Sequence, residues 1–501
     1  MNGQDIRGET VMVVKRGIKN LMKNTMRLFT IVIIVSFVVS PLYNIQAKTM
    51  DDGSEEKAVA DKRPKASYLS TPTLRDANTF DYIADSVINP DEKMKSADKI
   101  ADELKKNYGC RYLTSIPGMP LDEYKEAFSY LWKNCTVKKK PIELSLDISE
   151  KYSYDTIVKY MKALSRYEGV YLYQIGETQQ GRPMYALEID VPSEVKKKKT
   201  VVLTGSTHAR ETAGTVFIIK HLIELLQADT EESKEILSKF SIVAVPCTNP
   251  DGREGVAFDT KRYTYSNGKL WKGTANGTDL NRNFPGLVWS QVGKGNSKTD
   301  YLSSSPKKPY YPGTHAGSIP ETKAMMKFLY YYVVKQKAAV LIDYHQQGSI
   351  GYAGKPWDSK YHRNKCHKLA DAMFSKMNKG NSRKYKWEDE ESGYGLIGTG
   401  STLTDYATSI AYGAKFSPAY GFCVYTDGDN EYPLCAIPKM DKNEIELIKE
   451  PNRKFACMTF EIGYGKEYLG YGSDARRKLA KEYNNYHFGQ VLYYLAEYLD
   501  N

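Results

Sequence analysis

Residues 200–211, TVVLTGSTHARE, carry the most information about the fold of this chain. It opens with a β-branched run typical of a buried strand, turns through Gly205-Ser206-Thr207 and reaches His208-Ala209-Arg210-Glu211. The residues that follow, 212–228, have the periodicity of a helix. An imidazole and a carboxylate three residues apart at a strand-to-helix turn can both reach one zinc ion. His208 and Glu211 are therefore candidate metal ligands.

The spacing alone is weak evidence for a metal site. The chain has 7 histidines and 60 acidic residues, so a chance match to His-x-x-acid is expected. A second match does occur at His221-Leu222-Ile223-Glu224, inside the helix that follows the first. We interpret it as ordinary helix sequence, because apolar residues surround it. The interpretation of His208 as a ligand must therefore rest on its partners.

Apolar, β-branched runs alternate with amphipathic segments through the rest of the chain. This alternation predicts an α/β domain with a mixed, largely parallel central sheet flanked by helices. Ligand sites in such sheets gather at the carboxyl ends of the strands. The predicted strands are residues 170–175, 183–189, 200–204, 241–246, 338–344 and 456–462, and the predicted helices are 155–166, 212–228, 320–334 and 474–499.

Two further polar residues stand at the ends of predicted strands. His345 follows the apolar run 339–344, and its imidazole points either into a site or into solvent. Glu461 lies in the apolar run 456–462, where a buried carboxylate is costly unless it is paired or functional. Both residues are candidates for the same site as His208.

A fourth element, residues 277–285, reads GTDLNRNFP and follows a loop rich in glycine and asparagine. An arginine fork with an asparagine amide beside it matches the two oxygens of a carboxylate. The alternative interpretation is a turn that carries a surface salt bridge.

Taken in order, THARE, NPDG, DLNRNF, PET, DYHQQG and TFEIG resemble the zinc carboxypeptidase family related to carboxypeptidase A. The resemblance covers roughly residues 150–497, and the wording DLNRNF is similar to that of bacterial secreted members, including cell-wall peptidases. It implies one Zn²⁺ per chain, held by His208, Glu211 and His345, with Glu461 as the general base. It also implies that Asp279 orients His208, that Asn281 and Arg282 hold the terminal carboxylate of the substrate, and that Arg210 lines the groove.

The chain departs from the family pattern in ways that bear on catalysis. The family's second arginine, which steadies the oxyanion, is absent from residues 271–277, WKGTANG, and Lys272 or Asn276 would take its place. Tyr394, which precedes the segment similar to the pocket wall, is our candidate for the mobile tyrosine that caps the substrate. The side-chain pocket falls at Leu403 or Thr404, and because neither is charged we expect neutral or apolar C-terminal side chains.

The link formed by residues 407–456 is longer than the resemblance implies, and we expect a flap or an exosite there. It contains Cys423 and Cys435, which are one candidate disulfide pair, and Cys110 and Cys135 are the other. No C-x-x-C pair occurs among the seven cysteines, so a zinc knuckle built from cysteines is not expected.

The N-terminal third has a different composition from the rest. We predict a signal peptide over residues 1–47, with a basic region, a 12-residue apolar run and a cleavage site before Lys48, and an uncleaved anchor is the alternative. Residues 48–67 are predicted to be a disordered linker and 68–149 a mainly helical extension or pro-segment. The catalytic domain would then span residues 150–501. The expected location is secreted or at the cell surface.

Other partner classes find little support in the sequence. The formal net charge is +11, but basic residues do not cluster with aromatic ones in any nucleic-acid motif, so no nucleic-acid partner is expected. Membrane contact is expected only through the signal segment. No G-x-S-x-G elbow is present, which argues against a serine esterase. His362, Cys366 and His367 lie on a charged segment that we interpret as a surface helix rather than as a second metal site.

The expected function is that of a secreted zinc metallocarboxypeptidase. It would remove C-terminal residues from peptides by means of a zinc-bound water and a glutamate base. One alternative is a wall peptidase that cuts γ-D-glutamyl–diamino-acid bonds in murein peptides with the same zinc centre. The other is a non-catalytic module that binds peptides or the wall on the same fold.

Overall fold

The structure is a computed structural model, and it describes part of the 501-residue chain. The described residues are 143–165, 167, 169–284, 302–354, 360–389, 401–411, 415–417, 422–427, 430–436 and 452–500. The predicted signal peptide and linker, nearly all of the predicted helical extension, Cys110, Cys135 and Tyr394 lie outside these residues. Within them, no helix combines the length and the apolar character needed to cross a membrane.

The described residues form one eight-stranded sheet in the order β1-β2-β4-β3-β5-β11-β6-β7. Its centre, β4-β3-β5-β11, is parallel, and the pairs β1/β2, β2/β4 and β11/β6 are antiparallel. This is the mixed, largely parallel sheet that the alternation of apolar runs predicts. The strands are β1 Val170–Glu177, β2 Pro183–Ile189, β3 Lys199–Gly205, β4 Phe240–Val245, β5 Val340–His345, β6 Ile350–Tyr352, β7 Lys386–Glu388 and β11 Ala456–Glu461.

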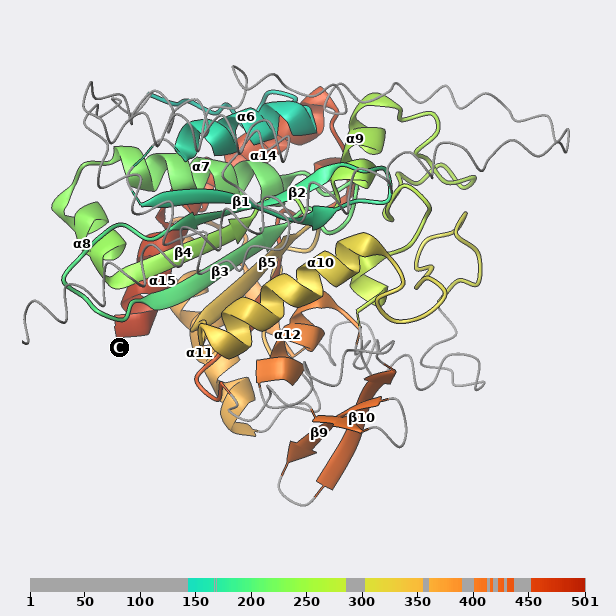
Figure 1. The fold of residues 1–501 in the computed structure, drawn as a ribbon. Helices are drawn as coiled ribbons and strands as arrows, with labels where there is room; N and C mark the ends of the chain where they lie inside the picture. The colour runs from blue at the N-terminus through green and yellow to red at the C-terminus, as the bar shows by residue number, and fades with distance from the viewer. Residues whose placement is uncertain are drawn as a thin grey trace, which may run out of the picture. The chain divides into compact units, whose positions relative to one another are not determined.

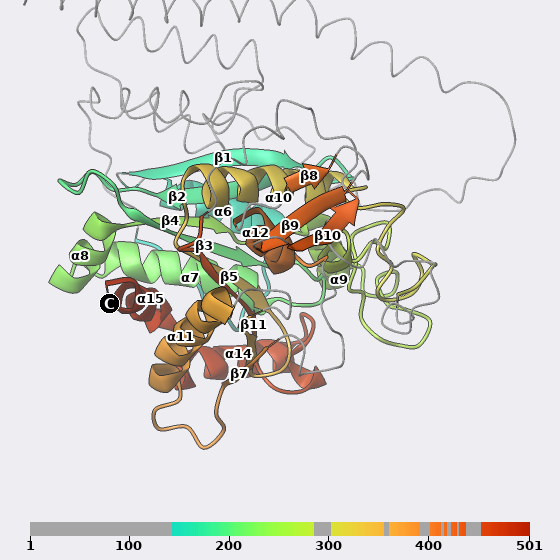
Figure 2. The ribbon, with the colours of Figure 1, turned by 90° about the horizontal axis from the view of Figure 1, so that it is seen from below.

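The central strands are continuous apolar runs because both faces of the sheet are covered. Every residue of β4 and β5 is buried. In Figure 1, α6 and α7 lie above the sheet, whereas α10 and α12 lie below it. In Figure 2, α11, α14 and α15 lie together beyond β5 and β11. The helices are α6 Tyr154–Leu164, α7 Ala213–Gln227, α8 Glu231–Lys239, α9 Pro250–Phe258, α10 Pro320–Leu329, α11 Lys360–Met377, α12 Leu403–Ala411, α14 Ser473–Asn485 and α15 Val491–Asp500.

Local signals explain where several helices begin. Ser153 caps α6 by accepting a hydrogen bond from the Thr156 N–H at 3.1 Å. Helix α9 starts with Pro250 after Asn249, whose side chain accepts from the Gly252 N–H at 3.0 Å. The NPDG stretch is thus a helix start that follows β4.

The C-terminal segment differs from its prediction as a single helix over residues 474–499. Helix α14 ends at Asn485, His487 adopts a left-handed backbone with φ of 51°, and a 3₁₀ turn leads into α15. The break lets Phe488 enter the core, where it is fully buried and packs 4.8 Å from the Phe217 ring. Burial of an aromatic ring outweighs the helical continuity that the periodicity indicated.

The link 407–456 contains a small antiparallel sheet in the order β10-β9-β8. Its strands are β8 Lys415–Ser417, β9 Phe422–Asp427 and β10 Asn430–Ala436. The register places Cys435 opposite Cys423 on neighbouring strands. A disulfide between them stays a prediction.

The second His-x-x-Glu match lies in the core. His221 is 1% exposed, with Nδ1 3.1 Å from the Tyr483 hydroxyl and Nε2 3.3 Å from the Tyr344 hydroxyl. The Tyr483 hydroxyl donates to Glu224 Oε2 at 2.5 Å, so Nδ1 carries the ring proton and Nε2 accepts from Tyr344. A neutral imidazole between two tyrosines is a packing element.

This arrangement predicts how stability depends on pH. Burial, and then the charge of Lys220, lower the pKa of His221 to about 3, below its value in the unfolded chain. The unfolded state therefore binds the proton first, and stability that is present above pH 6.5 is lost as pH falls toward 3. We expect the advantage of the wild type over His221→Gln to shrink by up to about 1.4 kcal/mol per pH unit in this window. Urea unfolding at pH 7, 5.5 and 4.5 measures it, and a constant difference would contradict it.

Candidate active site

The turn after β3 presents His208 and Glu211 beside the end of β5. Gly205 and Gly214 touch through their backbones, because a Cβ on Gly205 would lie 2.7 Å from the Gly214 carbonyl carbon. This close approach brings the start of α7 against the end of β3. Strands β3 and β5 are parallel, with Gly205 opposite Tyr344, so the turn and His345 meet at the same edge of the sheet.

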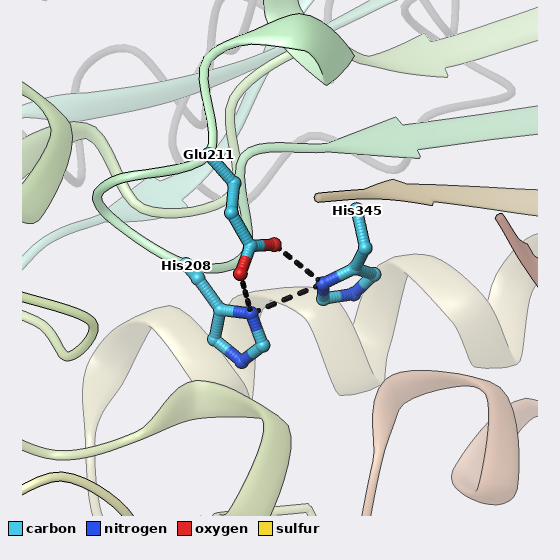
Figure 3. Close-up of side chains that lie close together, drawn as sticks. All are labelled: His208, Glu211 and His345. Carbon is cyan, nitrogen blue, oxygen red and sulfur yellow. Dashed lines mark hydrogen bonds and ion pairs between the residues drawn. The ribbon is translucent and has the colours of Figure 1, made fainter. Parts of the chain in front are cut away.

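Three side chains converge at this edge. Figure 3 shows Glu211 between the two imidazoles, with Oε1 2.7 Å from His208 Nδ1 and Oε2 2.8 Å from His345 Nδ1. The two Nδ1 atoms are 3.1 Å apart. All three side chains are buried, and their ligand atoms lie within 4.8 Å of one another. Two ring lone pairs and a carboxylate that converge in this way are suited to hold a cation.

The outer nitrogen of each histidine has a carboxylate partner. His208 Nε2 lies 3.2 Å from Asp279 Oδ1, and Asp279 Oδ2 lies 3.0 Å from the Lys272 ammonium. Burial alone would raise the pKa of Asp279, but the charges of Lys272 and His208 hold it well below its usual range. Asp279 is thus an anion within hydrogen-bond distance of His208, and its role in orienting that ring stays a prediction.

The partner of His345 was not identified from the sequence. His345 Nε2 lies 2.8 Å from Asp343 Oδ2 and 3.2 Å from Asn281 Nδ2. Burial would lower the pKa of His345, but the charges of Asp343 and Glu211 raise it well above its usual value. The sequence does contain a signal for this partner. Asp343 lies two residues before His345, and residues two apart on a strand share a face.

The third ligand candidate, Glu211, is held by the chain that follows β5. Its Oε2 accepts from the Gln346 backbone N–H at 3.2 Å. The Gln346 side chain accepts from the Ala213 N–H at 2.6 Å and donates to the Tyr468 carbonyl at 2.6 Å. Gln346 therefore ties β5 to the start of α7. No local pattern in the sequence indicated this contact.

Glu461 lies opposite His345, because the two residues pair in the register of β11 and β5. Its Oε2 atom is buried, and none of the described residues forms a hydrogen bond with it. Burial, and next the negative charge of Glu211, raise the pKa of Glu461 to about 7. A carboxyl group with this pKa can take up and release a proton near neutral pH, as a general base must.

Three basic side chains, Lys272, Arg282 and Arg210, act electrostatically on the carboxylates of this centre. Lys272 is buried and lies 4.4 Å from the centre of the Tyr310 ring, and the Arg282 guanidinium lies 5.8 Å from the same ring. Arg210 donates to the Leu270 carbonyl at 3.3 Å. The charges of Lys272 and Arg210 both oppose the rise in the pKa of Glu461. These positive charges partly offset the effect of burial and of the Glu211 charge on Glu461.

Of the two suggested replacements for the oxyanion arginine, the structure brings only Lys272 to the centre. Asn276 is exposed, and its Oδ1 accepts from the Thr274 hydroxyl at 2.7 Å and from the Thr278 N–H at 3.2 Å. The hydrogen bonds of the Asn276 side chain therefore stay within its own loop.

The interpretation of His362 and Cys366 as part of a surface helix is wrong in one respect. Both lie on α11, but both are fully buried, with Cys366 Sγ 3.5 Å from His362 Nε2. His367 is half-buried, contacts Asp389 at 2.5 Å and stacks on Trp387. These side chains belong to the face of α11 that packs on the domain. In the described part of the chain, the grouping able to share a metal is His208, Glu211 and His345.

Two imidazoles and a carboxylate at the carboxyl edge of a mixed α/β sheet, with a glutamate of raised pKa opposite, define a candidate metallohydrolase centre. Comparison with known proteins then gives the family, because the zinc carboxypeptidase model matches residues 157–446. The chain belongs to the zinc carboxypeptidase family.

Individual relatives match parts of the chain. Carboxypeptidase O of Bos taurus is 30% identical over 221 residues, which cover 40% of this chain and 54% of the relative. The inactive metallocarboxypeptidase ECM14 of Saccharomyces cerevisiae is 28% identical over 191 residues, covering 35% of this chain and 42% of the relative. The chain thus spans about half of the length of these curated relatives. Among solved structures, carboxypeptidase A of Helicoverpa armigera is 19% identical with a TM-score of 0.48, covering 80% of this chain and 87% of that one.

Proposed function

We propose that this protein is a zinc-dependent metallocarboxypeptidase that removes C-terminal residues from peptides. The observation that carries the proposal is the convergence of His208, Glu211 and His345, with Glu461 opposite. The donor set fits zinc, because two imidazole nitrogens and one carboxylate leave a coordination position open. When bound, zinc supplies Lewis-acid polarisation of the scissile carbonyl and makes water acidic enough to attack near pH 7.

The other residues around the centre have separate roles in the proposed reaction. Glu461 takes the proton of the attacking water and passes it to the nitrogen of the leaving amine. Asp279 keeps His208 in one orientation by accepting from its Nε2–H. Lys272 carries the positive charge that stabilises the developing oxyanion.

Selectivity for chain ends rests on Arg282 and Asn281. Asn281 Oδ1 already accepts from the Leu403 N–H at 2.9 Å, so the NH₂ group, which lies 3.2 Å from His345 Nε2, is the end of the amide that can donate to a carboxylate. The Arg282 guanidinium supplies a second set of donors for a terminal carboxylate. Leu403 and Thr404 are the residues we propose for the side-chain pocket, and the Thr404 hydroxyl is 3.0 Å from that of Thr459. We propose neutral C-terminal side chains for the substrate, and Tyr394 as the residue that caps it.

A second candidate function is a non-catalytic peptide-binding module on the same fold. Two observations favour it: Lys272 replaces the expected arginine, and one relative is named an inactive metallocarboxypeptidase. Metal content and hydrolysis distinguish the two proposals.

The test uses the full chain purified without chelator. We expect one zinc per chain and hydrolysis of a peptide with a free C-terminus. Amidation of that C-terminus should slow cleavage about 10- to 100-fold, since a charge-assisted contact to Arg282 is lost. Equal cleavage of the two peptides would contradict the carboxylate clamp. Cleavage restricted to a murein peptide would favour the wall peptidase, and zinc-loaded protein that cleaves neither would favour the binding module.

A further inference from the structure

The outer edge of the His345 ring faces a buried carboxylate. Its Nδ1 atom points at Glu211 and at His208 Nδ1, at 2.8 and 3.1 Å. Its Nε2 atom lies 2.8 Å from Asp343 Oδ2. If Nδ1 is to offer its lone pair to a metal, the single proton of a neutral ring must sit on Nε2. The residue that accepts this proton then decides which nitrogen is the ligand.

Asp343 is built into the sheet as an acceptor. It lies on β5 two residues before His345, so both side chains leave the same face of the strand, and it is fully buried. Its other oxygen, Oδ1, accepts from the Thr204 hydroxyl at 2.7 Å, and the Thr207 hydroxyl lies 3.4 Å away. A carboxylate buried among apolar strands is costly unless donors surround it. Here Thr204 on β3 and Thr207 in the turn after it supply those donors.

Asn281 also approaches the same nitrogen but cannot accept its proton. The Leu403 N–H donates to Asn281 Oδ1, so the end of the amide that faces His345 is the NH₂ group, 3.2 Å from Nε2. An NH₂ group and a ring N–H are both donors and do not bond to each other. The Nε2 proton is therefore directed to Asp343.

We propose that Asp343, held by Thr204, is a positioning residue for the metal centre. It fixes His345 in the Nδ1-ligand tautomer, fixes the plane of the ring and increases the basicity of the ligand nitrogen. The two histidines are then supported alike, with Asp279 behind His208 and Asp343 behind His345. This inference rests on the proposed zinc centre and goes beyond it by assigning a determinant of metal affinity.

The experiment measures the zinc dissociation constant of the full chain by chelator competition. Asp343→Asn keeps the shape but loses the charge, and it should weaken zinc binding about 10-fold, whereas Asp343→Ala should approach about 100-fold. Thr204→Val should weaken it by about threefold, since it removes one donor to Asp343. Unfolding of each metal-free variant in urea shows that the fold is retained.

The matched control is Glu188→Gln. Glu188 is a buried carboxylate on β2 that accepts from the Tyr332 hydroxyl at 2.6 Å and the Ser241 hydroxyl at 3.3 Å, and β4 and β3 separate its strand from β5. It should bind zinc like the wild type, and the visible spectrum of its Co²⁺-loaded form should be unchanged, whereas that of Asp343→Asn should shift.

The outcomes separate this inference from the proposed function. Wild-type protein that fails to bind zinc would overturn the proposed function itself. Tight zinc binding by the wild type together with unchanged affinity in Asp343→Asn and Asp343→Ala would overturn the positioning role alone. Equal weakening in Glu188→Gln and Asp343→Asn would also overturn it, because the loss would then be common to any buried carboxylate.

Discussion

Replacement of Glu461 by glutamine is expected to lower kcat for peptide hydrolysis by about 10²- to 10⁴-fold. The amide has the size and shape of the carboxyl group but cannot accept the proton of the attacking water. Glu461 Oε2 makes no hydrogen bond with any described residue, so the change breaks no such contact there. Zinc content and the midpoint of urea unfolding should therefore stay at wild-type values.

Initial rates on a peptide with a free C-terminus measure the effect, with zinc quantified in the same samples. Glu461→Asp is the graded control, since a shorter carboxylate keeps the chemistry and misplaces it, and it should retain more activity than the glutamine variant. Wild-type kcat in Glu461→Gln would show that the proton has another acceptor. Loss of zinc would instead give Glu461 a part in holding the metal.

The strands that carry this site could be predicted because their sequences are unambiguous. Both strands are buried, mainly apolar runs, and β5 and β11 end at the polar residues His345 and Glu461. Parallel neighbours in one sheet must place such ends together, and the register pairs these two residues. The strand ends alone made His345 and Glu461 candidates for one site, and the resemblance to the zinc carboxypeptidase family supplied the roles expected of them.

The elements that the sequence did not predict depend on contacts between distant segments. The side chain of Gln346 reaches the start of α7 and the Tyr468 carbonyl, and no local pattern encodes such a bridge. The break at His487 follows from the burial of Phe488 against other helices and strands. A periodicity read along one segment carries no information about either contact.

Two omissions could have been avoided with the sequence alone. Asp343 shares a face with His345 by the two-residue period of a strand, inside a run that is otherwise apolar. His362, Cys366, Leu369 and Met373 recur at helical spacing and are all fully buried. The charged residues between them concealed this buried face of α11.

Replacement of Lys272 is the second change expected to have a large effect on activity. This lysine stands where the family pattern leads one to expect an arginine. Its ammonium lies 3.0 Å from Asp279 Oδ2, and its charge also acts to lower the pKa of Glu461. Lys272→Met keeps the length and removes the charge, and it should lower kcat about 10²- to 10³-fold with little change in KM. Lys272→Arg, which keeps the charge, should stay within about tenfold of the wild type. Asn276→Ala alters only its own loop and should have wild-type kinetics.

The contact between Lys272 and Asp279 makes a zinc titration necessary to interpret the loss. If the charge acts on the oxyanion, kcat of Lys272→Met stays low when zinc is in excess, because the missing interaction forms only in the transition state. If its main role is to hold Asp279, the defect lies in zinc affinity, and excess zinc restores kcat. Full restoration would contradict the oxyanion role and leave the centre with no cation in place of the arginine. A persistent loss, together with recovery in Lys272→Arg, would show that a lysine ammonium serves where the family pattern has a guanidinium.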